Sequence, residues 1–276
     1  MPMLRVMTFN IRGASYREDG VNAWESRALL NIKAIKRARP DLIGFQELQM
    51  ENLIAYQQRL AEFDYVLGPK TANKEPYDYN AIFWKPSRLR RIDTGGFWLS
   101  ETPERPSAGW DATCIRAANW THFRITDGGE EFLHVNTHLD HLHGKARKKG
   151  TELLLQRIAQ FQKANDPIIL TGDFNCHPNS PVYGLLLESG FVDTYLATGN
   201  RDGEHSTTFH AYGCNTPLSS GAEPERVRRF DWILLRDPSR RLYPIYCEII
   251  RDAEPPVYPS DHYPVLTEFG VGEVHE

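Results

Sequence analysis

Six short polar clusters, spread along the chain, each end or follow an apolar run. They are Thr8–Asn10, Phe45–Glu47, Asn136–His141, Gly172–Asn175, Arg229–Trp232 and Ser260–His262. Their Asn, Glu, Asp and His side chains are the types that hold a hard divalent cation and a phosphate group beside a proton-transfer pair. The pattern therefore predicts a metal-dependent phosphoesterase.

Glu47 directly follows the apolar run 41–45, where an unpaired carboxylate would be costly. We expect a cation as its partner, because hard divalent cations bind carboxylate oxygens. Asn10 offers a neutral amide at another strand end, which suits a metal-bound water or a phosphate oxygen. The structural alternatives are a helix-capping carboxylate for Glu47 and a turn residue for Asn10.

The sequence Gly172-Asp173-Phe174-Asn175 follows an Ile-Ile-Leu run. The glycine allows close backbone approach, and the alternating Asp173 and Asn175 point to the same side of an extended segment. One of them can orient or deprotonate a water while the other holds a phosphate oxygen. The bare pattern also occurs in ordinary turns, but its place after a predicted strand favours a site.

A carboxylate stands beside an imidazole at Asp261 and His262, and Asp231 heads another predicted strand. A histidine held by a buried carboxylate is fixed in tautomer and raised in basicity, which suits a general base or a phosphate clamp. The alternative is a surface Asp-His pair before a proline.

Three histidines and an aspartate lie within residues 138–143, which raises the alternative of a zinc site. Dinuclear zinc hydrolases carry H-x-H-x-D-H, whereas the order here is H-x-D-H-x-H, and no cysteine is near. His138 better suits protonation of a leaving oxygen or clamping of a phosphate. We expect His141 to line the pocket and His143 to be exposed.

Strands and helices must position these clusters. Apolar residues at helical spacing predict helices at 25–38, 51–60 and 146–163. The predicted strands are 4–11, 41–45, 65–67, 79–84, 89–99, 115–125, 131–137, 167–171, 230–235, 245–250 and 263–269. Those between 65 and 137 are expected to form a meander, and 198–225 a long loop. Strands and helices in both halves predict two packed sheets with helices outside, a four-layer α/β/β/α sandwich.

The composition is that of an ordinary globular protein, with 276 residues, of which 41% are hydrophobic and 25% charged. Because the clusters span its length, we expect a single domain over residues 1–276, and a monomer. The net charge of −4 gives no global attraction to nucleic acid or anionic membrane, and the basic run 145–149 is expected to be a solvated face. The four separated cysteines favour a cytoplasmic setting, and no apolar run reaches the roughly 18 residues of a membrane span.

In this order the clusters resemble the endonuclease/exonuclease/phosphatase superfamily, which includes DNase I, apurinic endonucleases, sphingomyelinases, inositol polyphosphate phosphatases and deadenylases. The resemblance runs from Asn10 to His262. The segment 97–103, with Gly109-Trp110-Asp111 and Arg116, is similar to a bacterial and fungal subgroup of phosphodiesterases or nucleases.

The resemblance implies a DNase I-like sandwich of two mixed sheets with Mg²⁺ or Mn²⁺ at the site. Glu47 matches the principal metal ligand and Asn10 its neighbour, and Asp261 would complete the metal site.

The same resemblance assigns roles in catalysis. Asp173 matches the residue that orients or deprotonates the attacking water, and Asn175 matches a phosphate-binding residue. His262, supported by Asp231, would contact the scissile phosphate, and His138 would be the second phosphate-site histidine.

Further residues of the subgroup are expected to bind the substrate, together with Asn10 and Asn175. These are Arg116, His141 and Asp78. In relatives with the second histidine a carboxylate, often glutamate, supports it from the region of strand 79–84. Asp78 is the candidate here and is one methylene shorter.

The implied reaction is direct attack of an activated water on phosphorus, without a covalent enzyme intermediate. A small phosphodiester or phosphomonoester fits the acidic net charge and the lack of an extended basic run. An endonuclease or exonuclease acting on DNA or RNA is the alternative. A non-catalytic binding module is a remote alternative, against which the intact set of polar residues argues. We expect no membrane partner.

Overall fold

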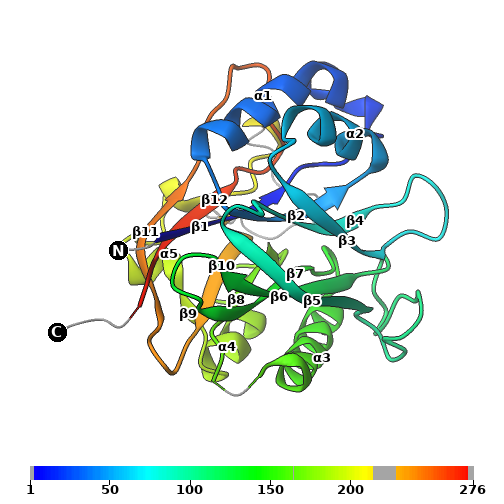
Figure 1. Ribbon diagram of the computed structural model, residues 1–276. Helices are drawn as coiled ribbons and strands as arrows, with labels where there is room; N and C mark the ends of the chain where they lie inside the picture. The colour runs from blue at the N-terminus through cyan, green and yellow to red at the C-terminus, as the bar shows by residue number, and fades with distance from the viewer. Residues whose placement is uncertain (1–2, 164, 214–227, 273–276) are drawn as a thin grey trace.

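The computed structural model describes residues 3–163, 165–213 and 228–272, and two six-stranded sheets face each other in it (Figure 1). Helices α1 (Trp24–Ala38) and α2 (Met50–Arg59) lie on the outer face of one sheet. Helices α3 (Gly144–Phe161) and α4 (Pro181–Glu188) lie on the outer face of the other. The predicted four-layer α/β/β/α sandwich is therefore confirmed.

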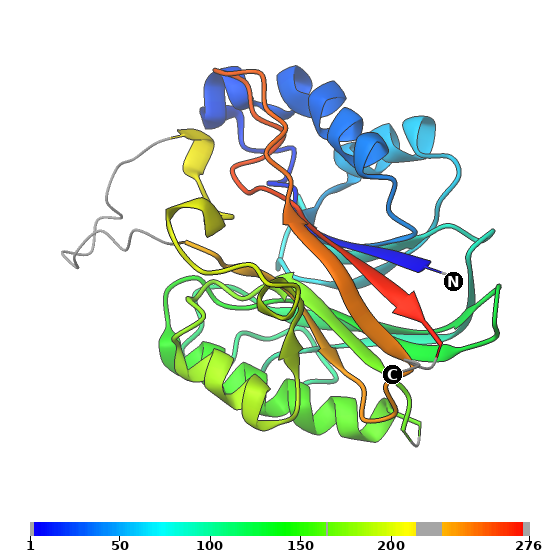
Figure 2. The same cartoon turned by 90° about the vertical axis from the view of Figure 1, so that its left-hand side faces the viewer.

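The first sheet has the strand order β11-β12-β1-β2-β4-β3. Its strands are β1 (Met3–Asn10), β2 (Leu42–Leu48), β3 (Asp64–Lys70), β4 (Tyr79–Trp84), β11 (Leu242–Ile249) and β12 (Val265–Val271). Strand β1 is parallel to β2 and antiparallel to β12, so the sheet is mixed. Figure 2 shows the first and last strands of the chain, β1 and β12, side by side.

The second sheet has the order β5-β6-β7-β8-β10-β9. Its strands are β5 (Leu89–Trp98), β6 (Ala117–Ile125), β7 (Glu131–His138), β8 (Ile168–Asp173), β9 (Val192–Asp193) and β10 (Asp231–Arg236). Strands β7 and β8 are parallel and the other pairs are antiparallel. Each sheet thus contains one parallel pair whose carboxyl ends can carry a site.

Two expectations about the elements need correction. The strands between 65 and 137 are not one meander, because β3 and β4 pair with the first sheet while β5, β6 and β7 form a meander in the second. Helix α4 and the short α5 (Thr194–Ala197) were not predicted. The expected loop 198–225 contains the short 3₁₀ turns Glu204–Ser206 and Ala211–Gly213, and its part 214–225 lies outside the described residues.

Three apolar layers hold the sandwich together. Phe9, Phe45 and Tyr56 belong to the layer beneath α1 and α2, and Val6 and Phe269 to the layer between the sheets. The third layer lies beneath α3 and α4 and includes Leu154, Leu170 and Trp232. Burial of such side chains contributes roughly 1.5–3 kcal/mol each, which gives the strand ends a rigid base.

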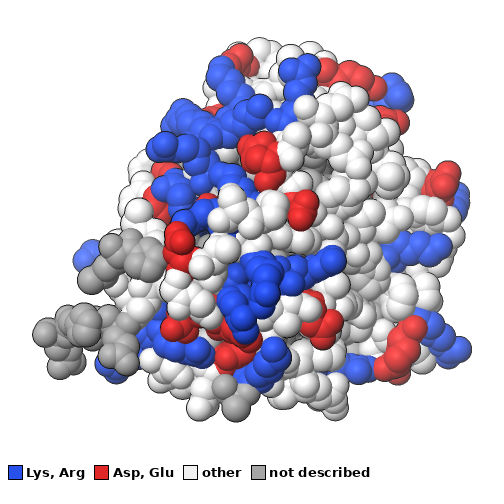
Figure 3. Space-filling view, in the orientation of Figure 1, with Lys and Arg blue, Asp and Glu red and all other residues white. Residues whose placement is uncertain are grey.

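The next features are the charges on the surface and the state of the cysteines. On the face shown in Figure 3, Lys and Arg side chains lie in several groups with Asp and Glu among them. Cys114, Cys176 and Cys247 are free thiols, whereas Cys214 lies outside the described residues. None of the described helices is long and apolar enough to cross a membrane.

Candidate active site

The parallel pairs of the two sheets end close together and bring the predicted polar residues to one edge. Strand β1 ends at Asn10, β7 at His138 and β8 at Asp173, with His138 and Asp173 directly paired. The Asn10 amide nitrogen lies 2.9 Å from Asp173 Oδ2 and 3.0 Å from Glu47 Oε1. Asn10 therefore joins the two sheets by donating to one carboxylate from each.

Glu47 occupies a strained position near the end of β2. Its φ of 60° is unfavourable for a residue with a side chain, and the pairing of β2 with β4 shifts register between Phe45 and Leu48. Glu47 Oε2 is buried and has no hydrogen-bond partner among the described residues. Burial raises the pKa of Glu47, but His138 and Arg12 outweigh it and lower that pKa. The carboxylate is thus ionised with one oxygen unused.

Asp261 is a second carboxylate at this edge, and Arg12 Nε lies 4.0 Å from its Oδ2. Ser260 Oγ bonds the Asn10 carbonyl at 2.8 Å and Asp261 Oδ1 at 3.2 Å, which fixes this segment against β1. Burial and the negative charge of Glu47 raise the pKa of Asp261. Two neighbouring carboxylates that repel each other, one with a buried oxygen that lacks a hydrogen bond to a described residue, fit a hard divalent cation bound through oxygen.

Asp173 is surrounded by donors. Its Oδ1 accepts from the Asn175 backbone at 2.9 Å, and its Oδ2 accepts from Asn10 and lies 3.3 Å from His138 Nε2. Burial opposes ionisation, but His262 and His138 depress the pKa of Asp173 well below its usual range. The residue is therefore a fixed anion.

His262 lies between Asp173, which ends β8, and Asp231, which begins β10. Its Nδ1 lies 2.8 Å from Asp231 Oδ2, and its Nε2 lies 3.7 Å from Asp173 Oδ2. Burial would lower its pKa, but Asp231 and Asp173 raise the pKa of His262 to about 10. The ligand atoms of these three residues lie within 4.8 Å of one another. A protonated imidazole therefore offsets part of the negative charge of the two aspartates between which it lies.

The partner of His138 differs from the one expected. Its Nδ1 faces Arg116 Nη1 at 3.1 Å, and Arg116 Nη2 faces His141 Nδ1 at 3.3 Å. Because a guanidinium can only donate, His138 Nδ1 is the acceptor in the contact with Arg116. Its Nε2 lies 3.3 Å from Asp173 Oδ2 and 3.0 Å from Asn175 Nδ2. Asp78 instead accepts from Gln49 Nε2 at 2.7 Å. The described contacts thus give His138 Nδ1 the guanidinium of Arg116 in place of the carboxylate of Asp78, while its Nε2 faces Asp173.

The 138–143 segment has no carboxylate free for a zinc site. Asp140 Oδ1 accepts the backbone amides of Leu142 and His143 at 3.0 and 2.7 Å, and Oδ2 accepts that of Thr113 at 2.8 Å. Asp140 therefore shapes two loops. His143 is exposed at the start of α3, as expected.

A cavity of about 540 Å³ collects the predicted residues. It is lined by Glu47, Asp78, Arg116, His138, His141, Asp173, Asn175, Asp261 and His262. Asn10 and Asp231 lie behind this lining, each bonded to a residue that forms it.

Sequence reasoning missed two arginines that shape this cavity. Arg12 lines it, donates to Asp19 at 3.1 Å and lies 3.7 Å from the centre of the Tyr16 ring. Arg27 of α1 is fully buried and donates to the carbonyls of Ile11 at 2.8 Å and Pro259 at 3.0 Å, so it holds the segments after Asn10 and before Asp261. Arg12 could have been found from its place two residues after Asn10, whereas no sequence signal marks Arg27.

The fold and the edge cluster of carboxylates, amides and histidines define a phosphoric ester hydrolase with the DNase I-like fold. A family model described as the Endonuclease/Exonuclease/phosphatase family matches residues 7–262. The chain belongs to this family, which confirms the resemblance seen in the sequence.

Solved structures and curated proteins agree with this assignment. An endonuclease/exonuclease/phosphatase of Bacteroides vulgatus is 28% identical, with a TM-score of 0.85, and the match covers 98% of this chain and 100% of that one. A mannosyl-6-phosphatase of Bacteroides thetaiotaomicron is 29% identical, with a TM-score of 0.84 and coverage of 97% and 99%. Nocturnin of Drosophila melanogaster is 27% identical over 175 residues, which are 59% of this chain and 26% of nocturnin. The chain thus matches about a quarter of that relative's length.

Proposed function

We propose that this chain hydrolyses a phosphate ester of a small molecule by direct attack of water, and that the reaction depends on Mg²⁺ or Mn²⁺. One observation carries the proposal: a single cavity holds an anion with an unpartnered oxygen (Glu47), a fixed anion (Asp173) and a fixed cation (His262). Ester hydrolysis at phosphorus needs these three features, because charge develops on both the attacking and the phosphoryl oxygens.

Glu47 and Asp261 are the residues that would hold the cation. Their donors are all oxygens, which suits Mg²⁺ or Mn²⁺ better than zinc. Bound there, the cation would neutralise charge on the phosphoryl oxygens as a Lewis acid. Asn10 donates to Glu47 and Asp173 and accepts the Arg12 backbone amide at 3.0 Å, so in this arrangement it positions both carboxylates.

Asp173 would orient the attacking water. Its pKa is depressed, so it is a weak base toward a free water molecule. We therefore assign proton transfer to Asp173 late in the attack, when the bond to phosphorus has made the water strongly acidic. No covalent enzyme intermediate is needed.

The two histidines and Asn175 would bind the phosphoryl group. His262 carries a positive charge at neutral pH, because Asp231 and Asp173 raise its pKa to about 10. It can donate from Nε2 to a phosphoryl or leaving oxygen. Asn175 Nδ2 lies 3.0 Å from His138 Nε2, so both can face one phosphate oxygen.

The cavity favours a small substrate. Its volume of about 540 Å³ lies within the roughly 300–1,000 Å³ of small-molecule pockets. Neutral polar side chains that suit hydroxyl groups form part of the lining, namely Tyr16, Thr71, Asn73 and Thr113. The similarity to a mannosyl-6-phosphatase makes a phosphorylated sugar the first small ester to test.

The basic run at the start of α3 gives little support to the nuclease alternative. Lys145 pairs with Asp111 at 2.8 Å, Lys149 pairs with Glu152 at 2.7 Å, and Arg147 donates to the Asp140 carbonyl at 2.9 Å. Cations already paired with acidic neighbours bind a phosphate backbone less strongly than free ones.

The test is a hydrolysis screen in chelator, Mg²⁺, Mn²⁺ or Zn²⁺. The substrates are an aryl phosphodiester, an aryl phosphomonoester, hexose 6-phosphates, single- and double-stranded DNA, and RNA. We expect hydrolysis of small esters with Mg²⁺ or Mn²⁺, none with chelator, and none by Glu47→Ala. Glu51→Ala, which removes an exposed carboxylate from the first turn of α2, should retain wild-type activity.

Two results would contradict the proposal. Faster turnover of DNA or RNA than of every small ester would replace the substrate class with a nucleic acid. Full activity in chelator, or in a correctly folded Glu47→Ala variant, would remove the assigned cation site.

A further inference from the structure

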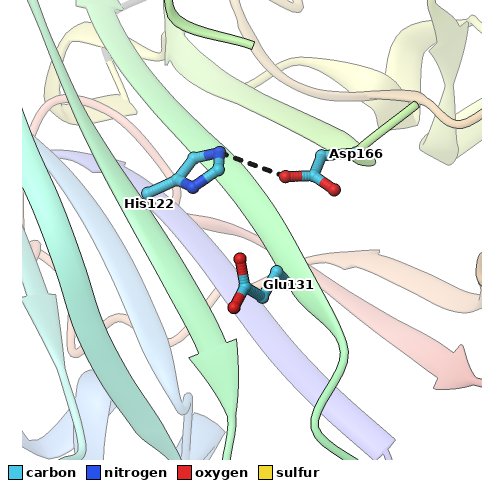
Figure 4. A group of neighbouring side chains, drawn as sticks. All are labelled: His122, Glu131 and Asp166. Atoms are coloured by element: carbon cyan, nitrogen blue, oxygen red, sulfur yellow. Dashed lines mark ion pairs between the residues drawn. The ribbon is translucent and has the colours of Figure 1, made fainter. Parts of the chain in front are cut away.

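A second group of ionisable side chains lies at the opposite end of β7 and β8 from the cavity. His122 comes from β6, Glu131 begins β7, and Asp166 lies just before β8. One ligand atom from each residue lies within 4.8 Å of the other two. In Figure 4 the three side chains point toward one another.

His122 is the unusual member of the group. It is 2% exposed, and neither ring nitrogen forms a hydrogen bond with any part of the chain that the structure describes. Its Nε2 lies 3.4 Å from Asp166 Oδ2, which is also buried and without a hydrogen bond to a described residue. Buried polar atoms without partners are costly, so this pair of atoms points to a ligand.

Each nitrogen of an imidazole can bind a metal ion through its lone pair. Because neither ring nitrogen of His122 has a hydrogen bond to a described residue, one of them is available to a ligand at this place.

We propose that His122, Glu131 and Asp166 bind a divalent transition-metal ion, for which zinc is the best match. Imidazole nitrogen and carboxylate oxygen both bind zinc, and three protein ligands with one water complete a tetrahedral site. Mg²⁺ disfavours a nitrogen ligand, so this site and the all-oxygen site near Glu47 should select different metals.

Three cations near the site compete with the metal for the carboxylates. Arg124 and Lys163 pair with Glu131, the latter at 3.4 Å, and Arg241 lies 3.4 Å from Asp166 Oδ1. Arg241 contacts Oδ1 of Asp166, whereas His122 faces Oδ2. The oxygen that would bind the metal is therefore not occupied by Arg241. Lys163 is half exposed, and such surface pairs are weak and easily displaced. Loss of Lys163 should therefore tighten metal binding.

The bound ion would connect three separate segments. It would hold β6 and the start of β7 to the segment that leads from α3 into β8. A ligand that binds only the folded state raises stability by mass action, so we expect zinc to raise the melting temperature.

The experiment measures zinc per chain by mass spectrometry of protein stripped with chelator and dialysed against micromolar zinc with millimolar Mg²⁺. Wild-type protein should hold one zinc more than His122→Leu and Asp166→Asn. Asp127→Asn, which changes an exposed carboxylate in the turn after β6, should match wild type. Lys163→Gln should lower the zinc dissociation constant about 3- to 10-fold, which is the scale of one weak ion pair.

Thermal unfolding separates metal binding from a folding defect. In chelator, His122→Leu should be at least as stable as wild type, because leucine leaves no unpartnered nitrogen. With zinc, wild type, Asp127→Asn and Lys163→Gln should gain stability, whereas His122→Leu and Asp166→Asn should not. If His122→Leu does not fold, Asp166→Asn decides the question. Equal zinc content in wild type and the folded variants would overturn the proposal.

Discussion

Histidines and carboxylates lie at both ends of β7 and β8, but the histidines at the two ends differ in whether they have hydrogen-bond partners. At the carboxyl ends, His262 Nδ1 faces Asp231 at 2.8 Å and His138 Nδ1 faces Arg116 at 3.1 Å. At the amino ends, neither nitrogen of His122 has a hydrogen bond to a described residue. Fixed partners hold the imidazoles of the cavity in one orientation, as hydrolysis requires, whereas an imidazole without a hydrogen-bond partner can bind a metal.

The largest effect expected from this comparison is that of Asp173→Asn. The amide keeps the shape of Asp173 but removes the charge that faces His138 and His262. We expect kcat to fall about 10³-fold or more, or roughly 4 kcal/mol of transition-state stabilisation. Steady-state kinetics on the preferred small ester measures this change.

Asp166→Asn is the matched control at the other end of β8. It removes one buried carboxylate from the same part of the fold, so kcat in saturating Mg²⁺ should remain within about twofold of wild type. Similar losses in both variants would mean that the two ends are not functionally distinct.

Local sequence patterns predicted most of the sandwich. The range 79–84 matches β4, and the helix predicted over 25–38 begins one residue earlier in the structure. Helix α4 was missed, although Ser180 caps it by accepting from the Tyr183 amide and proline follows at its first position. A strongly apolar segment of eight residues has no clear helical period, so these end signals were the only guide.

The site was predicted less completely, because its partners are distant in the sequence. Glu47 could be chosen because a carboxylate after an apolar run needs a partner. The contact of Arg116 with His138 spans 22 residues and depends on a loop conformation, so only the resemblance to the family offered a candidate partner, and that candidate was Asp78. His122 follows the alternation of a strand like any other residue, and only the described structure shows that it has no hydrogen bond.

Arg116→Met should give the second largest effect. Methionine keeps an extended side chain but loses the donors to His138 and His141, so the Nδ1 atom of each imidazole loses the partner that orients the ring. We expect kcat/KM to fall about 10- to 100-fold, or roughly 1.4–2.7 kcal/mol, and its pH profile to change.

Arg124→Met tests the same substitution at the other end of β6. Arg124 is half exposed and pairs with Glu131, so its loss should leave kcat/KM unchanged. An unchanged pH profile in Arg116→Met would show that Arg116 acts on the substrate rather than on His138.

The smallest effect concerns His134, which lies on β7 between the two ends. It is fully buried, bonds Thr171 Oγ1 through Nε2 at 2.9 Å, and burial lowers its pKa to about 3. In the unfolded chain a histidine titrates near pH 6.5. Between these values the unfolded state binds one proton more, so stability is lost as the pH falls below 6.5, by about 1.4 kcal/mol per pH unit.

His134→Gln keeps a polar group near Thr171 but cannot be protonated. The part of the pH dependence of stability that comes from His134 should therefore be missing in this variant. Urea unfolding of both proteins between pH 7 and 5, in chelator, measures the difference. The free energy of unfolding of wild type, relative to that of the variant, should fall by about 1.4 kcal/mol per pH unit below 6.5. Other histidines contribute equally to both proteins and cancel. If the stabilities of the two proteins change in parallel with pH, His134 can accept a proton in the folded state. The contrast between His134, which has a hydrogen-bond partner, and His122, which has none among the described residues, would then need another cause.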